Sequence, residues 1–422
     1  MRAKIIDRFV DILKRFYRCR SRNKMKDSVL FIPHSGMCRV DRYSVINYKS
    51  DSALSFLHYI LENNLLLEKR LVVAIANDMD TKLFDNYVAE HYPNRNLSYL
   101  PMFTNIKLSK VDKLHSIIQV CKCIGSCSHI FSSISEDYSK SVSKDQVLID
   151  LNYYTCSMKN DILDSSSQYY MGLENAGHEY TYVVGTSELA IRLILPEMTI
   201  PYNKYVNLGM CRNDNVLNGD KCDWLRNEIL KKVRYKVNKI ILYTPTHRDY
   251  ESALKSGNRS VLGFDYNADD IQQFLNVNGI VFICKLHPKQ NALIVEKDLP
   301  EGLLLHKPDE RYGLTELMQV SDALVTDYTS AYFDYLLLDK PVIFNFYDLE
   351  LYKKERGVPF EPMSAIAAGE IVENVEEMKK ALLDLDNNAI NNKQKRAFVR
   401  DLFFTMQDTK SCERVYKFIF GK

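Results

Sequence analysis

Short, continuously apolar segments alternate with helical patterns along most of the chain, and this alternation restricts the folds that it can adopt. In the first half these segments are residues 29–33, 71–76, 129–134, 146–150 and 180–185. Between them lie stretches with helical spacing of apolar residues, such as residues 51–64 and 111–124. Strands that are apolar on both faces and joined by helices are typical of a parallel sheet with helices on both sides.

The same alternation starts again after residues 195–204, a proline-bearing segment that is typical of a linker. The second set of predicted strands comprises residues 239–246, 280–288, 302–307, 323–327 and 341–347. We therefore predict an α/β protein with two doubly wound, Rossmann-like domains facing a cleft, the GT-B arrangement. The predicted boundaries are 1–27 for a basic amphipathic N-terminal helix, 28–200 for the first domain and 201–422 for the second domain. The final helix of the second domain is expected to cross back to the first domain.

Charge and cysteine content exclude several protein classes. The net charge is only +2, which argues against a nucleic-acid partner. Ten cysteines in 422 residues are ordinary for an intracellular protein. Cys121, Cys123 and Cys127 cluster on a helical pattern, so small buried thiols are favoured over a zinc site, which stays open. With no run of eighteen apolar residues and no signal peptide, we expect a cytoplasmic chain.

The first 26 residues form a basic amphipathic pattern. Ten Lys and Arg residues against two Asp residues give this segment a charge of +8. Apolar residues recur at helical spacing between Ile5 and Tyr17. Such a helix is typical of binding to an anionic membrane surface. The alternative is that the apolar face packs on the protein and the charges are solvated.

Polar side chains follow three strands of the second predicted domain. In chain order they are Thr246, His247, Arg248 and Asp249; Lys285 and His287; and Thr326, Asp327, Tyr328, Thr329 and Ser330. Carboxyl ends of parallel strands meet at one edge of a sheet, where ligands bind. A helix that begins near Ser330 would attract an anion such as phosphate, although Thr329 or Ser330 capping that helix is the simpler alternative. The Arg248 guanidinium suits phosphate oxygens, and His287 can exchange protons near neutral pH.

Several motifs in residues 205–390 resemble the CDP-glycerol:poly(glycerophosphate) glycerophosphotransferase family. They are GMCRND, YTPTHRD, KLHP, SDALVTDYTSAYFDYLLLDKPVIFNFYDLELY and RGVPFEPMSAIAAGEIVENVEEM. The resemblance implies a GT-B fold in which the first domain binds the acceptor and the second binds the nucleotide donor. It makes His287 catalytic, and it places donor phosphates on Thr326, Asp327, Thr329 and Ser330. From their places at the strand ends, we expect Arg248 and Lys285 to bind the substrate beside them. It gives Arg212, Asn213 and Asp214 a structural role at the hinge between the domains.

The first domain departs from the family's W-H-G-x-P-L-K motif. The best counterpart is YYTCSMK, where Lys159 matches but Tyr154 occupies the position of the second catalytic histidine. Tyrosine, with a pKa near 10, is a poor base at neutral pH, but Tyr154 can orient a hydroxyl as a substrate contact. His34, which follows the strand at 29–33, is our candidate base; a purely structural role for it and the choice of His178 both stay open.

The resemblance implies a transferase that moves a polyol phosphate, expected to be glycerol phosphate, from a CDP-linked donor to an acceptor hydroxyl during synthesis of a bacterial cell-surface polymer, releasing CMP. The alternatives are a CMP-sugar-dependent GT-B glycosyltransferase and a non-catalytic scaffold subunit at the membrane. We expect no cofactor and no metal. The expected partners are a CDP-polyol donor, a lipid-linked or glycan acceptor and an anionic membrane surface, with the protein peripheral on the inner face of the cell membrane.

Overall fold

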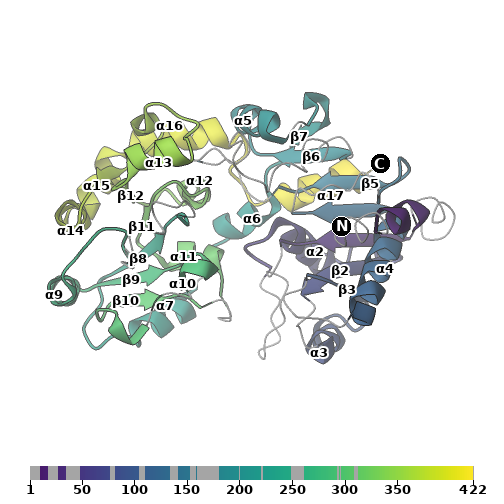
Figure 1. Cartoon of the computed structure of the whole chain (residues 1–422), viewed down its shortest axis with the longest axis horizontal. Helices are drawn as coiled ribbons and strands as arrows, with labels where there is room; N and C mark the ends of the chain where they lie inside the picture. Colours follow the sequence, from purple (N-terminus) through teal and green to yellow (C-terminus); the bar gives the residue numbers. More distant parts are fainter. Residues whose placement is uncertain are drawn as a thin grey trace. The chain divides into compact units, whose positions relative to one another are not determined.

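The computed structural model forms two compact units, described below as unit 1 and unit 2 (Figure 1). Unit 1 consists of Met1–Tyr153, Ser167–Asn215 and Asp408–Lys422, and unit 2 consists of Tyr154–Ser166 and Val216–Gln407. The described residues are 10–17, 27–34, 48–76, 81–103, 110–133, 141–152, 158, 180–198, 200–219, 222–248, 261–291, 294, 296–307 and 312–421.

Unit 1 contains a parallel sheet in the order β3-β2-β1-β4-β5-β6-β7. Its strands are β1 (Ser28–Ile32), β2 (Arg70–Ala76), β3 (Leu97–Phe103), β4 (His129–Ser132), β5 (Val147–Asp150), β6 (Tyr182–Gly185) and β7 (Tyr205–Asn207). In the register of the central strands, Leu30 of β1 lies between Val72 of β2 and Ile130 of β4. Every residue of β1 is buried, as expected for a strand covered on both faces.

Helices cover both faces of this sheet. They are α2 (Ser52–Glu62), α3 (Thr81–His91), α4 (Lys110–Ser126), α5 (Glu188–Met198), α6 (Cys211–Leu217) and the C-terminal α17 (Ser411–Phe420). Phe31 of β1 packs in one apolar cluster with Phe56 of α2 and Val415 of α17. Its neighbour Leu30 packs in another cluster with Ile124 of α4. Alternate residues of a single strand therefore supply two cores, one on each face.

Unit 2 contains a second parallel sheet in the order β10-β9-β8-β11-β12-β13. Its strands are β8 (Lys239–Thr244), β9 (Ile280–Cys284), β10 (Leu303–Leu305), β11 (Ala323–Thr326), β12 (Val342–Asn345) and β13 (Glu370–Val372). The chain proceeds from β8 outward to β10, then returns to the other side of β8 with β11. The order of strands thus reverses between β8 and β11, and such a switch point is where open α/β sheets bind ligands.

The helices of unit 2 also lie on both sides of their sheet. They are α7 (Asp223–Leu230), α9 (Ala268–Asn278), α10 (Pro288–Asn291), α11 (Leu314–Val320), α12 (Ala331–Leu336), α13 (Leu349–Glu355), α14 (Val375–Leu383), α15 (Leu385–Asn391) and α16 (Lys393–Phe403). Ile271 of α9 and Met378 of α14 pack in one cluster with Phe282 of β9. Phe333 of α12 and Phe403 of α16 are in ring contact, with centroids 4.4 Å apart.

The predicted α/β class with two doubly wound sheets is confirmed. The interpretation of residues 195–204 as a linker is wrong, because α5 continues to Met198 and a short 3-10 helix, Tyr202–Lys204, leads directly into β7. Unit 1 accordingly extends beyond this segment to Asn215. Among the helices within the described ranges, none is both long and apolar enough to cross a bilayer.

Candidate functional site

The three polar loops predicted from the sequence follow neighbouring strands of unit 2. Strands β9, β8 and β11 are adjacent in the sheet, and all are parallel. Lys285 and His287 follow β9, Thr246 to Arg248 follow β8, and Asp327 to Ser330 follow β11. The carboxyl edge at the switch point therefore brings these residues together. We call this set of loops the rim.

Thr326 and Asp327 lie inside the rim rather than on its surface. The Thr326 hydroxyl is fully buried and donates to the backbone oxygen of Thr244 at 2.9 Å. One carboxylate oxygen of Asp327, also buried, accepts the backbone N–H groups of Thr246 (2.8 Å) and Tyr328 (2.6 Å). These two residues thus connect the β8 and β11 loops, so in this structure they position the rim. The sequence had predicted direct phosphate contacts for both.

Arg248 is bound by two carboxylates. Its Nη1 donates to Asp327 at 2.7 Å, and its Nε and Nη2 donate to the two oxygens of Asp348 at 2.8 and 3.0 Å. The guanidinium also lies 5.2 Å from the ring centroid of Tyr328 and 5.1 Å from that of Tyr352. Burial alone would lower the pKa of Arg248, but Asp327 and Asp348 hold it well above its usual value. Three N–H groups of Arg248 are thus engaged by protein carboxylates, and its role in phosphate binding stays a prediction.

Lys285 is the cation of the rim without a carboxylate partner. Its backbone N–H donates to the oxygen of Tyr243 at 2.8 Å, which fixes the residue at the end of β9. Within the described part of the chain, its ammonium group makes no hydrogen bond and no ion pair. Partial burial lowers the pKa of Lys285, because desolvation disfavours its charged form. A desolvated and unpaired ammonium group is suited to an anionic ligand.

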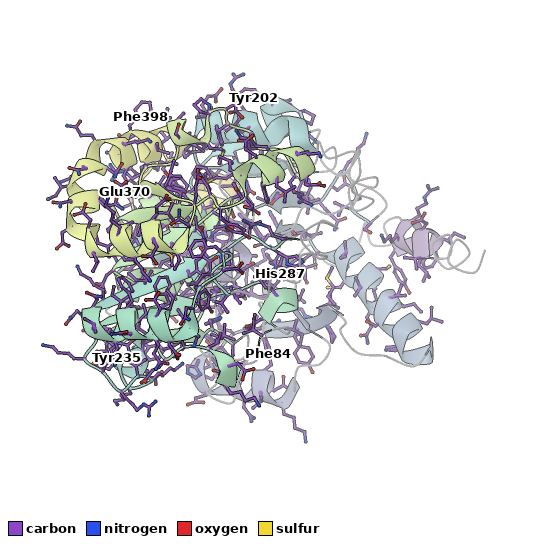
Figure 2. The ribbon with its side chains drawn as sticks, turned by 60° about the vertical axis from the view of Figure 1, so that its left-hand side comes forward. Phe84, Tyr202, Tyr235, His287, Glu370 and Phe398 are labelled. Carbon is purple, nitrogen blue, oxygen red and sulfur yellow. The ribbon has the colours of Figure 1, made fainter. Side chains whose placement is uncertain are left out.

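Two histidines stack at the rim. The rings of His247 and His287 are nearly parallel, at 15°, with their centroids 4.6 Å apart. His287 is exposed and directly precedes α10 (Figure 2). Its backbone oxygen accepts the N–H groups of Gln290 and Asn291, both at 2.9 Å. An exposed imidazole beside the Lys285 loop is placed to reach a bound phosphate.

Thr329 and Ser330 supply hydroxyl groups at the start of α12, and both are partly buried. Ser330 occupies the N-cap position, yet its side chain makes no capping hydrogen bond. Thr329 Oγ1 accepts the N–H of Ala331 at 3.4 Å, which is long for such a bond. The Ser330 hydroxyl therefore does not cap α12, which was the simpler alternative that the sequence left open.

In unit 1, His34 follows β1 and lies beside β4, at the switch point of that sheet. Its backbone N–H donates to Oδ2 of the buried Asp51 at 2.9 Å. Asp51 Oδ1 accepts the N–H of Leu54 (2.9 Å) and the hydroxyl of Ser133 (3.0 Å). Burial raises the pKa of Asp51, although these hydrogen bonds oppose the shift. Asp51 thus ties the His34 loop to the start of α2 and to the loop after β4.

Some predicted residues lie outside the described part of the chain: Tyr154, Lys159, His178 and Asp249. Of the GMCRND motif, Arg212 and Asn213 are buried in α6. Asp214 accepts the N–H groups of Ser411 and Cys412, both at 2.8 Å, and so caps α17.

The sequence analysis missed Asp348, which holds Arg248 from the far side. Asp348 follows β12, the strand next to β11. The strand-end rule that located the other rim residues would have found it if it had been applied to this fourth strand. Tyr328 also donates its hydroxyl to Asp348 at 3.2 Å, which adds to the same network.

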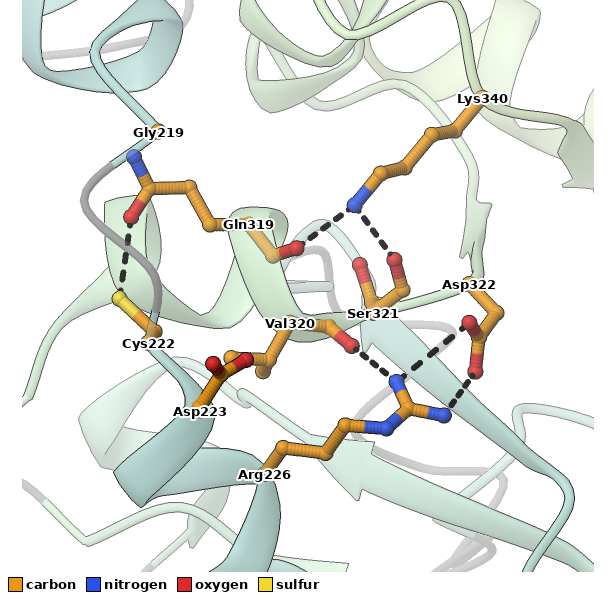
Figure 3. Close-up of a pocket in the computed structure, with 9 residues that line it drawn as sticks. All are labelled: Gly219, Cys222, Asp223, Arg226, Gln319, Val320, Ser321, Asp322 and Lys340. Carbon is orange, nitrogen blue, oxygen red and sulfur yellow. Dashed lines mark hydrogen bonds and ion pairs between the residues drawn. The ribbon is translucent and has the colours of Figure 1, made fainter.

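A hollow of about 220 Å³ lies at the opposite edge of the same sheet (Figure 3). Arg226 donates to both oxygens of Asp322, at 3.4 and 3.2 Å, and Asp322 accepts the N–H of Ile240 at 2.7 Å. Lys340 donates to the backbone oxygen of Ser321 at 2.7 Å, and burial lowers its pKa to about 8. Because these groups bond one another at the amino ends of β8, β11 and β12, the hollow is a structural junction rather than the ligand site.

Comparison with known proteins identifies relatives in teichoic acid synthesis. The chain is 25% identical over 267 residues to a teichoic acid glycerol-phosphate transferase of Staphylococcus aureus (strain NCTC 8325 / PS 47), covering 61% of this chain and 65% of the relative. It is 29% identical over 188 residues to a teichoic acid glycerol-phosphate primase of Bacillus subtilis (strain 168), covering 44% and 45%. The matches thus span less than two thirds of these relatives.

Solved structures show the same fold. The wall teichoic acid polymerase TagF, in a variant with CDPG, matches with a TM-score of 0.71 at 18% identity, covering 99% of this chain and 94% of that chain. UDP-GlcNAc 2-epimerase from Neisseria meningitidis matches with a TM-score of 0.52 at 13% identity, covering 93% and 100%. The family described as CDP-Glycerol:Poly(glycerophosphate) glycerophosphotransferase matches residues 54–421, a range that contains the rim but not His34. The chain therefore belongs to the CDP-glycerol:poly(glycerophosphate) glycerophosphotransferase family.

Proposed function

We propose that this protein transfers a polyol phosphate, glycerol phosphate in the first instance, from a CDP-linked donor to an acceptor hydroxyl during synthesis of a bacterial cell-surface polymer, and releases CMP. The observation that carries the proposal is the desolvated ammonium group of Lys285 at the switch point of unit 2, which has no partner among the described residues. Family membership supports the reaction class, and the functions of the relatives support the choice of polymer.

In the reaction, the acceptor oxygen attacks the β-phosphorus of the CDP-polyol. The bond from that phosphorus to the bridging oxygen breaks, and the bridging oxygen leaves on CMP with the electron pair. Lys285, His287 and the hydroxyls of Thr329 and Ser330 surround the phosphates and stabilise the charge that develops on their oxygens. The Asp327–Arg248–Asp348 network holds these loops in place. Such positioned charges are present before the reaction and need little rearrangement.

His34 takes the proton of the acceptor hydroxyl in this scheme. Its position at the switch point of unit 1, on a loop fixed by Asp51, supports the assignment. Tyr154 and Lys159 contact the acceptor, following their correspondence to the family motif. The acceptor is a lipid-linked or glycan polymer. The basic N-terminal helix binds the anionic inner surface of the cell membrane and so brings the enzyme to a lipid-linked acceptor.

The test is release of CMP from a panel of CDP-glycerol, CDP-ribitol and CMP-sugars with a short polymer acceptor. We expect release from a CDP-polyol only, and loss of release in His287→Ala. His34→Ala should lower turnover by roughly 10²-fold with little change in donor binding. His115→Ala is the matched control, because His115 is exposed on α4. Release from a CMP-sugar alone, or near wild-type turnover in His287→Ala, would overturn the proposal.

A further inference from the structure

Two side-chain amide oxygens next to the rim are buried and have no hydrogen-bond donor. They are Oε1 of Gln290 and Oδ1 of Asn291, and this statement covers the part of the chain that the structure describes. Both residues belong to α10, three and four positions after His287, whose backbone oxygen accepts their N–H groups. Residues with this spacing lie on one face of a helical turn. The side chains of Gln290 and Asn291 therefore start within one helical turn of His287.

The orientation of the Asn291 amide is fixed by its neighbour. Asn291 Nδ2 donates at 3.1 Å to the backbone oxygen of His306, the residue after β10. Because a carbonyl oxygen only accepts, the reversed amide would place two acceptors against each other. The N–H of His306 in turn donates to Cys284 at the end of β9, at 3.0 Å. Asn291 Oδ1 is thus a fixed acceptor at the carboxyl edge of β9 and β10.

The position of these oxygens relative to the rim indicates which part of a nucleotide they would meet. Phosphates at the rim lie over β9, β8 and β11. On the β12 side, Arg248, Asp348 and Tyr352 fill the edge with a buried ion pair and a packed ring. The open direction for a nucleoside attached to such phosphates would then be toward β10, past α10. A buried acceptor that lacks a donor is costly, so a ligand that supplies the donor gains affinity there.

We propose that Asn291 and Gln290 form the base subsite of the donor and select cytosine. The exocyclic amine of cytosine donates hydrogen bonds, whereas uracil has a carbonyl acceptor at the same position. Acceptor oxygens at this place favour the first base and repel the second. The inference rests on the proposed function, since it assumes that a nucleotide binds at the rim.

The test compares binding of CMP and UMP to the full chain by isothermal titration calorimetry. We expect the wild type to prefer CMP. Asn291→Leu, which keeps the size of the side chain but removes the amide, should weaken CMP binding about tenfold and strengthen UMP binding, because the acceptor that repels the uracil carbonyl is gone. Gln290→Leu should act in the same direction. The Gln290 side chain makes no hydrogen bond to the described residues. Gln290→Leu therefore shows the effect of losing an acceptor oxygen without losing a contact such as that between Asn291 and His306.

The matched control is Asn278→Leu. Asn278 also donates its side-chain amide to a backbone oxygen, that of Phe274 at 2.8 Å, but it directly precedes the amino end of β9. CMP binding should be unchanged in this variant. If the wild type binds neither nucleotide, the proposed function fails. If it binds CMP and both Leu variants at 290 and 291 keep the full preference over UMP, the base subsite is wrong while the proposed function stands.

Discussion

Arg248 joins two carboxylates that come from different strand ends of unit 2. Its side chain is 11% exposed, and those of Asp327 and Asp348 are 2% and 9% exposed. Removal of one partner from such a buried network leaves the opposite charge without compensation, which costs more than the original pair contributed. The residue-scale role of Arg248 is therefore to position the loops of the rim.

Arg248→Met tests this role. We expect it to lower the free energy of unfolding by about 3–5 kcal/mol in urea titrations, because Asp327 and Asp348 stay buried without their cation. Asp327→Ala should also destabilise, since Asp327 holds Thr246, Tyr328 and Arg248.

The control for Arg248→Met is Arg234→Met, whose partner is Glu301. Arg234 is 90% exposed, so its loss should change stability by less than about 1 kcal/mol. Unchanged stability of Arg248→Met together with loss of CMP binding would support the phosphate-binding role that the sequence predicted.

Lys285 gives the rim a pH dependence. Burial lowers its pKa, so it loses its proton at a lower pH than an ordinary lysine. Phosphate affinity that depends on its charge is present below that pKa and is lost as pH rises through it. As pH rises above neutral, CMP affinity should begin to fall at a lower pH in the wild type than in Lys285→Arg, whose guanidinium stays charged. Lys285→Met should bind weakly throughout. Identical profiles for the wild type and Lys285→Arg would contradict the role of Lys285.

Most residues of the rim could be located from the sequence, but their contacts could not. Lys285, His287, Thr329 and Ser330 follow apolar strands, so the strand-end rule places them on one edge. Arg248 follows the same rule, yet its partner Asp348 lies 100 positions away. Which anion a cation meets depends on tertiary geometry, and no local pattern distinguishes a protein carboxylate from a ligand phosphate.

At the scale of elements, α17 depends on Asp214. Its carboxylate accepts the first N–H groups of the helix, and Cys412 and Val415 of α17 are buried in the core of unit 1. Burial raises the pKa of Asp214 despite these hydrogen bonds. An N-terminal cap of this kind offsets unpaired donors and complements the helix dipole.

Asp214→Ala should therefore loosen α17. We expect a loss of about 1–2 kcal/mol in the free energy of unfolding and faster hydrogen exchange across residues 411–420. Asp408→Ala is the control, because Asp408 pairs with Arg414 of the same helix but is 48% exposed. Equal effects of the two substitutions on exchange would show that the cap does not hold the helix.

Helices with clear periodicity and most of the continuously apolar strands, including the three-residue β10 (Leu303–Leu305), were predictable from the sequence. The helices predicted at 51–64 and 111–124 correspond to α2 and α4, which show clear helical spacing. Strands β3, β7 and β13 were not predicted from the sequence. Strand β3 contains Pro101, which weakens a strand pattern, and β7 and β13 have three residues each. Such short strands gain their stability from pairing with a neighbouring strand, which the local sequence does not encode.

At the scale of the whole molecule, positive charge is concentrated at the N-terminus. The first 26 residues carry +8, whereas the whole chain carries +2, so the remainder is net negative. We therefore assign the proposed attraction to an anionic membrane to this segment. In the described part of its helix, residues 10–17, Ile12 is 64% exposed and Phe16 is 47% exposed, while Val10 and Leu13 are partly buried. Two apolar side chains one turn apart thus remain available to a bilayer.

We expect the full chain to bind vesicles that contain anionic lipid and to dissociate as salt shortens the Debye length to about 3 Å at 1 M. Deletion of residues 1–26 should abolish this binding yet preserve turnover on a short soluble acceptor. Ile12→Ser combined with Phe16→Ser should weaken binding while keeping the charge, because it removes buried apolar area at the membrane. Cosedimentation with vesicles of stated anionic content measures each effect.

The matched control exchanges the same residue types elsewhere. Ile390 and Phe398 are 71% and 62% exposed, and Phe398 projects from α16 (Figure 2). Helix α16 carries four Lys and Arg residues against one Asp, a surplus of only +3 compared with +8 in the first 26 residues, so Ile390→Ser with Phe398→Ser should weaken vesicle binding much less than the N-terminal pair. Binding that is insensitive to salt, or a truncated chain that no longer folds, would show instead that the N-terminal apolar face packs on the protein, the alternative that the sequence left open.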